Sequence, residues 1–528
     1  MTRLAVILAI STSLLAAAAP AQQADGIDKL LAGPSANAAP GCAVGVSRDG
    51  KVVAERAYGM ADIEHGIPAT PQSIYEAGSV SKQFTAAALL LLARDGKLKL
   101  SDDIRTYLPE LQDYGAPVTI RHMIQHISGL RDWGAVAAME GWPRNSRSAN
   151  NQDVLAIAAR QAKLNFAPGS HYSYSNSNYN LAAILVSRVS GESLADFTRK
   201  RIFEPLGMGT THWRDSYQRL VPGRATAYAR EGGGYVIDQP IEDAYGNGGL
   251  LTTVKDLLIW NDALQADKLG AGFRDEMEQV GVLTDGTHIT YASGLMVSTH
   301  RGVREVAHSG STGGYRAWLA RYPAQGLSIA LLCNGADSNP ITIGRSIADL
   351  YLSGLAPLPA YKPSGPAPSG LFVSAASGLP LRIKADADGR LSINNSPLTP
   401  VAKGRWRLQD TDYLFGKDGN LIVEANGEKL PYRRVEQVET TDPAPYAGRY
   451  CGTDNPFCML ITKAADGGLA ITTTGRLGLA AQPLKPAAAD LFTSGAGTVR
   501  FLRAGSGRVN ALHLGDSRAW AVEFVRVE

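Results

Sequence analysis

The sequence predicts an α/β (α+β) domain, in which an antiparallel sheet is flanked by helices, followed by two small all-β antiparallel domains. Three observations predict this order. Strand-like apolar runs lie near residues 42–58 and 314–333, and a largely helical middle lies between them. A proline-rich segment at 356–368 then precedes short strand-like runs with glycine-rich turns. Strands at both ends of the first domain indicate one sheet that closes between those ends, because strands from the start of the domain join strands from its end.

Each sheet-forming end of the first domain contains a predicted hairpin. An Asp49-Gly50 turn joins strand-like runs at 42–46 and 51–58, and such a turn suits two antiparallel strands. A Pro-Ala-Gln-Gly turn joins similar runs at 314–322 and 327–333. Apolar periodicity and helix-forming composition predict helices at 79–95, 120–126, 152–161, 180–189, 193–202, 254–264 and 341–352.

The region after the proline-rich segment contains an internal repeat. Ser369-Gly-Leu-Phe372 is similar to Ala447-Gly-Arg-Tyr450, and residues 432–436 are similar to residues 524–528. Repetition of this kind indicates two copies of one unit, and the glycine-rich turns favour barrels or sandwiches. The expected organisation is a signal peptide at 1–21, a first domain at 22–355, a linker at 356–368 and β domains at 369–440 and 441–528.

The N-terminus has the pattern of a secretory signal. A charged start with Arg3 precedes an apolar run to Ala19 and a small-residue exit before Gln22. We therefore expect an exported protein, periplasmic or secreted. No later segment is apolar for long enough to span a bilayer. The net charge of +3 comes without a basic run interleaved with aromatic residues, so a nucleic-acid partner is not expected.

Four cysteines are too few for a disulfide scaffold in a chain of this size. Cys451 and Cys458 bracket a short turn, which makes a local disulfide plausible in an oxidising compartment. Cys42 and Cys333 lie in apolar runs, and we expect them to be two buried thiols. The sequence alone leaves the bridging of both pairs open. No metal-ligand spacing occurs, and neither a metal nor another cofactor is expected.

Ser79-Val-Ser-Lys82 places a hydroxyl and an amine three residues apart at the start of a predicted helix. Side chains at this spacing lie on one face of a helix, so Lys82 can serve as a base for a Ser79 nucleophile. Burial and the dipole at a helix start both disfavour the charged form of the amine. A lone Ser-x-x-Lys pattern also arises by chance, and further residues have to support it.

Two more polar motifs follow along the chain. Tyr174-Ser-Asn176 lies in a turn-forming stretch before an apolar helix, and it is either a plain helix-entry loop or a source of a phenol and a carboxamide for catalysis. His308-Ser309-Gly310-Ser311 follows the start of an apolar strand. Its simplest interpretation is a single surface histidine on an edge strand.

The order of these motifs resembles that of the serine β-lactamase and penicillin-binding-protein superfamily, and within it most of all the D-aminopeptidases. The resemblance covers essentially the whole mature chain, including both β domains. It rests on the Ser79 and Lys82 segment 77–85, on His126-Ile-Ser-Gly-Leu130, Phe166-Ala-Pro-Gly169, Tyr174-Ser-Asn176, Glu204-Pro-Leu-Gly-Met208, Gly246-Asn-Gly-Gly-Leu250 and His308-Ser-Gly310.

This resemblance implies a β-lactamase/transpeptidase-like catalytic domain with two lipocalin-like barrels. It implies that Ser79 is acylated, that Lys82 and Tyr174 exchange its proton, and that Asn176 positions the substrate. His308 occupies a position where many β-lactamases have lysine, which argues against efficient β-lactamase action. The backbone N–H groups of Ser79 and Ser311 would form the oxyanion hole, beside Ser309 and Gly310.

The resemblance also implies that a loop of the last domain lies near the site. The matching segment is 475–484, with Gly478, Leu479 and Gln482 as the candidate residues. This loop would limit the acyl group to a single residue; a plain exposed turn is the alternative.

The function expected from these motifs is release of N-terminal D-residues from short peptides or amino-acid amides through an acyl-enzyme. DD-carboxypeptidase, esterase or weak β-lactamase action shares the same chemistry. A non-catalytic protein that binds penicillin or peptidoglycan fragments is an alternative of another class. β-Lactams are expected as inhibitors, and the sequence leaves the oligomeric state, a homodimer included, open.

Overall fold

The structure is a computed structural model that describes residues 23, 25–31, 38–143, 147–363, 368–474 and 480–527. The predicted signal peptide at 1–21 lies outside the described residues. The chain divides into two compact units, each made of several segments. The first comprises Met1–Ala88, Glu192–Gln279 and Ser293–Pro357, and the second comprises Leu89–Gly191, Val280–Ala292 and Leu358–Glu528.

The first unit is built on a six-stranded antiparallel sheet with the order β10-β11-β12-β13-β1-β2. Its strands are β1 (Cys42–Arg48), β2 (Lys51–Tyr58), β10 (Met296–His300), β11 (Val303–Thr312), β12 (Tyr315–Tyr322) and β13 (Leu327–Cys333). Strands β1 and β13 come from opposite ends of the domain and pair directly, with Val44 opposite Leu331. The predicted sheet that closes between these ends is confirmed.

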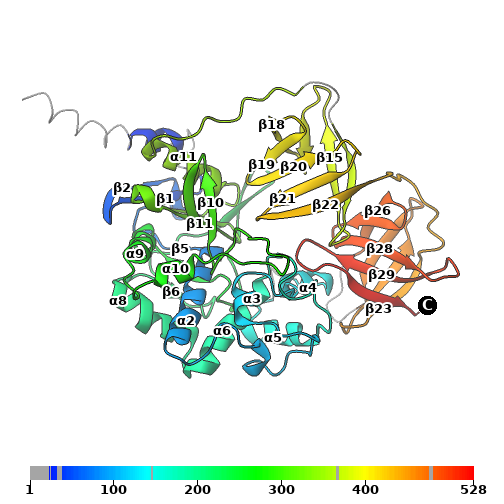
Figure 1. Ribbon diagram of the computed structural model, residues 1–528, viewed down its shortest axis with the longest axis horizontal. Helices are drawn as coiled ribbons and strands as arrows, with labels where there is room; N and C mark the ends of the chain where they lie inside the picture. Colours follow the sequence, from blue (N-terminus) through cyan, green and yellow to red (C-terminus); the bar gives the residue numbers. More distant parts are fainter. Residues whose placement is uncertain are drawn as a thin grey trace, which may run out of the picture. The chain divides into compact units, whose positions relative to one another are not determined.

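Helices α9 (Val254–Gln265) and α11 (Pro340–Tyr351) cover this sheet (Figure 1). Successive residues of a strand point to opposite faces. Val44 and Val46 pack in one apolar cluster with Ile347 of α11, whereas a side chain at Gly45 would meet Leu258 of α9. The two helices therefore lie on opposite faces, and the sheet is buried on both.

Both pairs of cysteines are bridged. Cys451–Cys458 is a local disulfide, in line with the expectation for that turn. Cys42 and Cys333 also form a disulfide, so the prediction of two buried thiols is wrong. The physical reason is the strand register, because β1 and β13 place these two residues directly opposite each other.

A helical rod, whose residues 89–94 are counted with the second unit, and several short elements complete the first unit. The rod consists of a 3₁₀ turn, η1 (Gly78–Ser81), which continues directly into α2 (Lys82–Arg94). The helix predicted at 193–202 is divided between α7 (Leu194–Thr198) and a π-helical turn, η3 (Arg199–Phe203). The remaining elements are β3 (Met60–Asp62), β4 (Ile67–Pro68), β5 (Tyr75–Glu76), α8 (Glu204–Leu206), β6 (His212–Trp213), β7 (Tyr228–Glu231), β8 (Gly234–Ile237), β9 (Leu250–Thr252), α10 (Phe273–Met277) and η4 (Pro323–Gln325).

The second unit begins with a group of helices. These are η2 (Ile104–Thr106), α3 (Ile120–Ile124), α4 (Trp133–Met139), α5 (Asn151–Arg160) and α6 (Asn176–Ser190). Side-chain caps define where they begin: Thr119 caps α3, Asp132 caps α4 and Asn150 caps α5. Each cap accepts backbone N–H groups that have no partner within the helix.

The β part of the second unit contains two antiparallel assemblies. The first is a nearly closed, nine-stranded barrel in the order β17-β16-β15-β14-β22-β21-β20-β19-β18, and the second is a closed barrel of β23 to β30. The first contains β14 (Gly370–Ser374), β15 (Pro380–Ala385), β16 (Leu391–Ile393), β17 (Ser396–Pro397), β18 (Thr399–Ala402), β19 (Arg405–Leu408), β20 (Thr411–Phe415), β21 (Leu421–Ala425) and β22 (Glu428–Val435). The second contains β23 (Gly448–Gly452), β24 (Cys458–Lys463), β25 (Leu469–Thr473), β26 (Gln482–Ala488), β27 (Leu491–Ser494), β28 (Gly497–Arg503), β29 (Val509–Gly515) and β30 (Val522–Arg526).

The internal repeat is visible in how each assembly joins its ends. The first long strand pairs with the last in both, β14 with β22 and β23 with β30. Arg434 of β22 donates to the carbonyl of Ser369, and Arg526 of β30 donates to the carbonyl of Ala447. The paired motifs at the start and end of each repeat are thus in contact.

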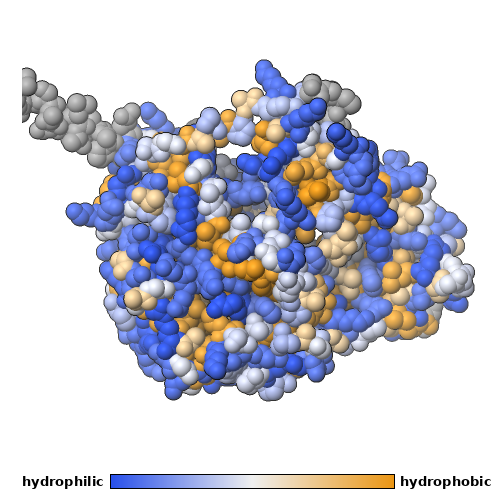
Figure 2. All heavy atoms as spheres, in the orientation of Figure 1, coloured by the Kyte–Doolittle hydropathy of each residue, from blue (hydrophilic) through white to orange (hydrophobic). Residues whose placement is uncertain are grey.

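No helix in the described part of the chain is long and apolar enough to cross a membrane. On the face drawn in Figure 2, hydrophobic residues are mixed with hydrophilic ones.

Candidate active site

The first unit brings Ser79 and Lys82 together at the start of the η1–α2 rod. The Nζ atom of Lys82 lies 3.2 Å from Ser79 Oγ. Lys82 is completely buried, whereas Ser79 is half-buried. The predicted neighbours on one helical face are therefore within hydrogen-bond distance, and the serine retains access to solvent.

A second contact fixes the lysine from the segment before β9. Lys82 Nζ donates to the carbonyl of Asn247 over 2.6 Å, and Thr85 Oγ1 donates to the carbonyl of Gly246. Ser81 Oγ accepts the N–H of Leu250. Three polar residues at the start of this helical segment, Ser81, Lys82 and Thr85, thus bind residues 246–250. These contacts explain why polar residues occur in an otherwise apolar helix.

The strand β11 approaches the rod very closely. A Cβ atom built at Gly78 would lie 2.6 Å from the backbone nitrogen of Ser311, and one at Gly310 would lie 2.0 Å from the carbonyl oxygen of Ala77. Gly78 also has φ of +51°, which favours glycine. The two glycines therefore permit the Ser311 N–H to lie directly beside the turn that carries Ser79, as the predicted oxyanion hole requires.

The same strand extends beyond its neighbour. Pairing of β10 with β11 stops at Met296 opposite Ala307, whereas pairing with β12 continues to Thr312. Among the described strands, none pairs with the β10-side edge of Ser309 to Thr312. This backbone edge, which includes Ser309 and Gly310, can accept an extended ligand.

His308 lies directly before this edge and is buried rather than on the surface. Burial and the positive charge of Lys82 lower the pKa of His308 to about 4, although a bond to the carbonyl of Ser309 opposes the shift. Because a carbonyl only accepts, Nδ1 carries the proton of the 2.6 Å bond to Ser309 O, and Nε2 is an acceptor. At neutral pH His308 is uncharged, unlike a lysine at this position.

We expect His308 to destabilise the folded protein in acid. The unfolded chain, with a histidine pKa near 6.5, binds a proton more readily than the folded protein does. Stability should therefore decrease from about pH 6.5 to about pH 4, and the shift corresponds to about 3 kcal/mol. Denaturant unfolding of the wild type and His308→Gln at both pH values tests this. Equal acid destabilisation of the two proteins would contradict it.

The second unit contains Tyr174 and Asn176, at the junction between a loop and α6. The ring of His126 lies 4.3 Å from that of Tyr174, centroid to centroid. His126 Nδ1 accepts the N–H of Ser175, and the carbonyl of His126 accepts the N–H of Ser173. The Tyr174 backbone is thus held on both sides by one residue of the predicted His-x-Ser-Gly-Leu motif.

Asn176 is the first residue of α6, and Asp132 fixes its position. The Asp132 Oδ2 atom accepts the Asn176 N–H over 2.6 Å, and Oδ1 accepts two N–H groups at the start of α4. One buried carboxylate therefore satisfies the N-terminal turns of two helices. Nothing in the sequence marks Asp132 apart from its place two residues after the His126–Leu130 motif.

A hairpin of the nine-stranded barrel contacts the same loop. Glu428 is buried, and its Oε2 accepts the N–H of Tyr172 over 2.8 Å, while Oε1 lies 3.0 Å from His171 Nδ1. A Cβ atom at the preceding Gly427 would clash with the backbone of His288. The hairpin thus fits closely and anchors the loop two residues before Tyr174.

We expect Glu428→Ala to lower turnover more than it raises KM. The substitution leaves the Tyr172 N–H without its acceptor, which costs about 1–3 kcal/mol, and it loosens the backbone that orients Tyr174. The exposed neighbour Lys429 provides the matched control, Lys429→Ala. Steady-state kinetics and thermal melts of both variants are the measurement. Full turnover in Glu428→Ala would show that the contact is only structural.

Within the second unit, the last barrel contacts the loop at 165–166 and the start of α4 through the turn at 516–521, between β29 and β30. The Trp520 N–H donates to Asn165 Oδ1, and its ring lies 5.1 Å from that of Phe166. The Arg518 carbonyl accepts the N–H of Asp132. Glu428 and this turn were missed at the level of sequence, because nothing in their local pattern marks them.

The loop expected near the site, 475–484, is described only at its end. Gly478 and Leu479 lie outside the described residues, and Gln482 is the first residue of β26, opposite Ile471 of β25. The proposed role of this loop therefore stays a prediction.

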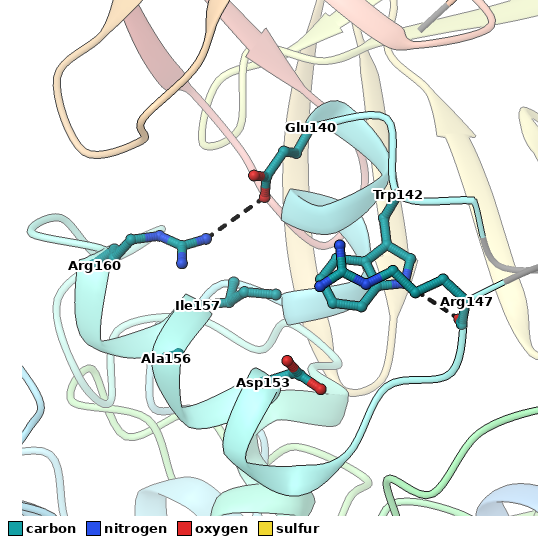
Figure 3. A pocket seen from close by; sticks show the side chains of 7 residues that line it. All are labelled: Glu140, Trp142, Arg147, Asp153, Ala156, Ile157 and Arg160. Atoms are coloured by element: carbon teal, nitrogen blue, oxygen red, sulfur yellow. Dashed lines mark hydrogen bonds and ion pairs between the residues drawn. The ribbon is translucent and has the colours of Figure 1, made fainter. Parts of the chain in front are cut away.

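A separate small pocket lies between the end of α4 and α5 (Figure 3). Arg160 pairs with Glu140 over 3.6 Å, and the Arg147 guanidinium lies 3.7 Å from the ring centroid of Trp142. Both arginines of the pocket thus have a partner within it, Glu140 for Arg160 and the Trp142 ring for Arg147. None of the predicted site residues lines this pocket.

Comparison with known proteins identifies the family of the chain. The family model described as Beta-lactamase matches residues 27–352. A D-aminopeptidase of Cereibacter sphaeroides (strain ATCC 17023) is 29% identical over 95% of this chain and 99% of its own length. One from Brucella canis is 27% identical over 92% and 96% of the two chains.

Solved structures show the same fold at lower identity. An octameric penicillin-binding protein homologue from Pyrococcus abyssi superposes with a TM-score of 0.56 at 22% identity, over 79% of this chain and all of its own. A D-amino acid amidase from Ochrobactrum anthropi SV3 gives a TM-score of 0.54 at 22% identity, over 62% and 97% of the two chains.

Proposed function

The chain belongs to the beta-lactamase family, and from that premise we propose that it is a serine hydrolase that removes N-terminal D-residues from short peptides or amino-acid amides. The observation that carries the chemistry is the buried Lys82 amine 3.2 Å from Ser79 Oγ. The names of the D-aminopeptidase relatives, which match nearly the whole chain including both β assemblies, support the substrate class.

In the proposed reaction Lys82, once it has lost its own proton, accepts the proton of Ser79 Oγ as this oxygen attacks the carbonyl carbon of the scissile amide. Negative charge then develops on the carbonyl oxygen, where the N–H groups of Ser79 and Ser311 donate to it. The C–N bond of the amide then breaks, and Tyr174 gives a proton to the departing amine and regains one from the protonated Lys82. Water hydrolyses the resulting ester, which releases the D-residue and restores Ser79.

The uncharged His308 supports a substrate without a carboxylate at this position. A lysine there would attract the carboxylate of a β-lactam or of a D-Ala-D-Ala terminus, whereas a neutral imidazole provides no positive charge. An aminoacyl group with a free amine is therefore the better match.

A substrate panel tests the proposal. The panel comprises D- and L-alanine p-nitroanilide, D-alaninamide, a D-Ala-D-Ala peptide, a short-chain ester and a cephalosporin, with intact-mass detection of the acyl-enzyme. We expect turnover of the D-aminoacyl amides. Turnover of only the cephalosporin or only the D-Ala-D-Ala peptide would overturn the aminopeptidase assignment, and no acylation at all would favour a binding protein.

We further propose that the protein is exported after removal of residues 1–21. The pattern of the first residues supports this, and so do the two disulfides, because such bonds persist in oxidising compartments. N-terminal sequencing of the mature protein from a periplasmic fraction should begin at Gln22. An intact N-terminus on protein retained in the cytoplasm would refute the proposal.

A further inference from the structure

The turn 516–521 of the last barrel brings an arginine to the Tyr174 loop. The guanidinium carbon of Arg518 lies 5.2 Å from the ring centroid of Tyr174. Its Nη1 atom lies 3.9 Å from Oδ2 of Asp132, the atom that accepts the N–H of Asn176. The positive charge is therefore next to the ring of Tyr174 and to the carboxylate that holds Asn176.

The Arg518 side chain is not what anchors the turn. The Arg518 carbonyl accepts the N–H of Asp132 and the side-chain amide of Asn165. Asp516 Oδ1 accepts the N–H groups of Arg518 and Ala519, and Trp520 packs on Phe166. All of these contacts remain if only the Arg518 side chain is changed.

The guanidinium also remains accessible to a ligand. The side chain is 45% exposed, whereas Asp132 is 2% exposed. The 3.9 Å separation from Asp132 is longer than a hydrogen bond, and within the described part of the chain no acceptor lies within hydrogen-bond distance of the guanidinium. Its five N–H donors suit bidentate binding of a carboxylate.

We propose that Arg518 binds the carboxylate of the leaving group, so that the preferred substrates are D-aminoacyl dipeptides rather than uncharged amides. This inference rests on the proposed function, in which Tyr174 gives its proton to the departing amine. A group beside the Tyr174 ring is then beside the leaving group. In a dipeptide the free carboxylate is attached one carbon from that amine, and the positive charge of Arg518 also disfavours the substrate's ammonium group on this side.

Two dipeptides that differ only in this charge test the proposal. We expect the wild type to release D-alanine from D-Ala-Gly with about tenfold higher kcat/KM than from D-Ala-Gly-NH2. In Arg518→Gln the two values should become equal through loss of D-Ala-Gly cleavage, and Arg518→Lys should restore part of the preference. Arg508→Gln, which changes an exposed arginine on another turn of the same barrel, should match the wild type.

A measurement on the wild type alone avoids any folding defect of the variants. Because Arg518 is exposed, salt should screen its attraction for the substrate carboxylate. The preference for D-Ala-Gly should therefore decrease when NaCl is raised from a low concentration to about 0.5 M, roughly three times physiological ionic strength. Equal cleavage of the two dipeptides by the wild type, or an unchanged ratio in Arg518→Gln, would overturn the role of Arg518 and leave the aminopeptidase proposal intact. Failure of the wild type to release D-alanine from either dipeptide or from D-alaninamide would overturn both.

Discussion

Ser79→Ala should abolish formation of the acyl-enzyme and lower turnover on the order of 10⁴-fold or more. The hydroxyl is the only group in the proposed reaction that forms a covalent bond to the substrate. Removing it leaves Lys82 and the Ser311 N–H without a nucleophile to activate. Intact-mass measurement with a D-alanine p-nitroanilide or a β-lactam, together with steady-state rates, is the test.

Ser81→Ala is the matched control, since it also removes a serine hydroxyl, two residues further along the same 3₁₀ turn. Ser81 is fully buried, where its Oγ donates to the Gly78 carbonyl and accepts the Leu250 N–H. Its loss should lower the melting temperature while acylation of Ser79 continues. An acylated Ser79→Ala protein, or one with near-normal turnover, would refute the assignment of the nucleophile.

The proximity of Ser79 and Lys82 could be predicted from sequence because their geometry is local. A spacing of three residues on a helix fixes which side chains are neighbours, and Lys82 is indeed within hydrogen-bond distance of Ser79. The resemblance also implied that the N–H groups of Ser79 and Ser311 lie close together, and Gly310 permits the approach of β11 that this needs. A larger residue there would clash with the backbone of Ala77.

The start of α6 shows where local pattern reading stops. Apolar periodicity placed this helix from residue 180, whereas it begins at Asn176. Ser and Asn are poor helix formers, and tertiary bonds stabilise the extra turn. Trp133 donates its N–H to Ser177 Oγ, and Ser128 donates to Asn178 Oδ1. Neither partner can be assigned without the fold.

Contacts between distant segments were beyond prediction for the same reason. Glu428 contacts Tyr172 across 256 residues of sequence, and the disulfide of Cys42 and Cys333 depends on the register of two strands 291 residues apart. Nothing in the sequence around Arg518 indicates that its side chain lies beside Tyr174. The β assemblies could be predicted as domains, but their contribution to the loop that carries Tyr174 required the structure.

Lys82→Ala should lower the rate of acylation by about 10³- to 10⁴-fold, because an unassisted hydroxyl is a weak nucleophile at neutral pH. The amine is completely buried and donates to the Asn247 carbonyl, so its removal also leaves that carbonyl without this donor, and some loss of stability is expected. Lys82→Arg separates loss of the base from loss of the donor. A guanidinium retains the positive charge and the donors but cannot act as a base, since arginine is not deprotonated in proteins.

The exposed Lys97→Ala is the control for loss of a lysine charge. Stopped-flow acylation rates and melting temperatures should show a slow Lys82→Arg enzyme, and acylation at the wild-type rate in this variant would show that Lys82 is a structural cation rather than the base.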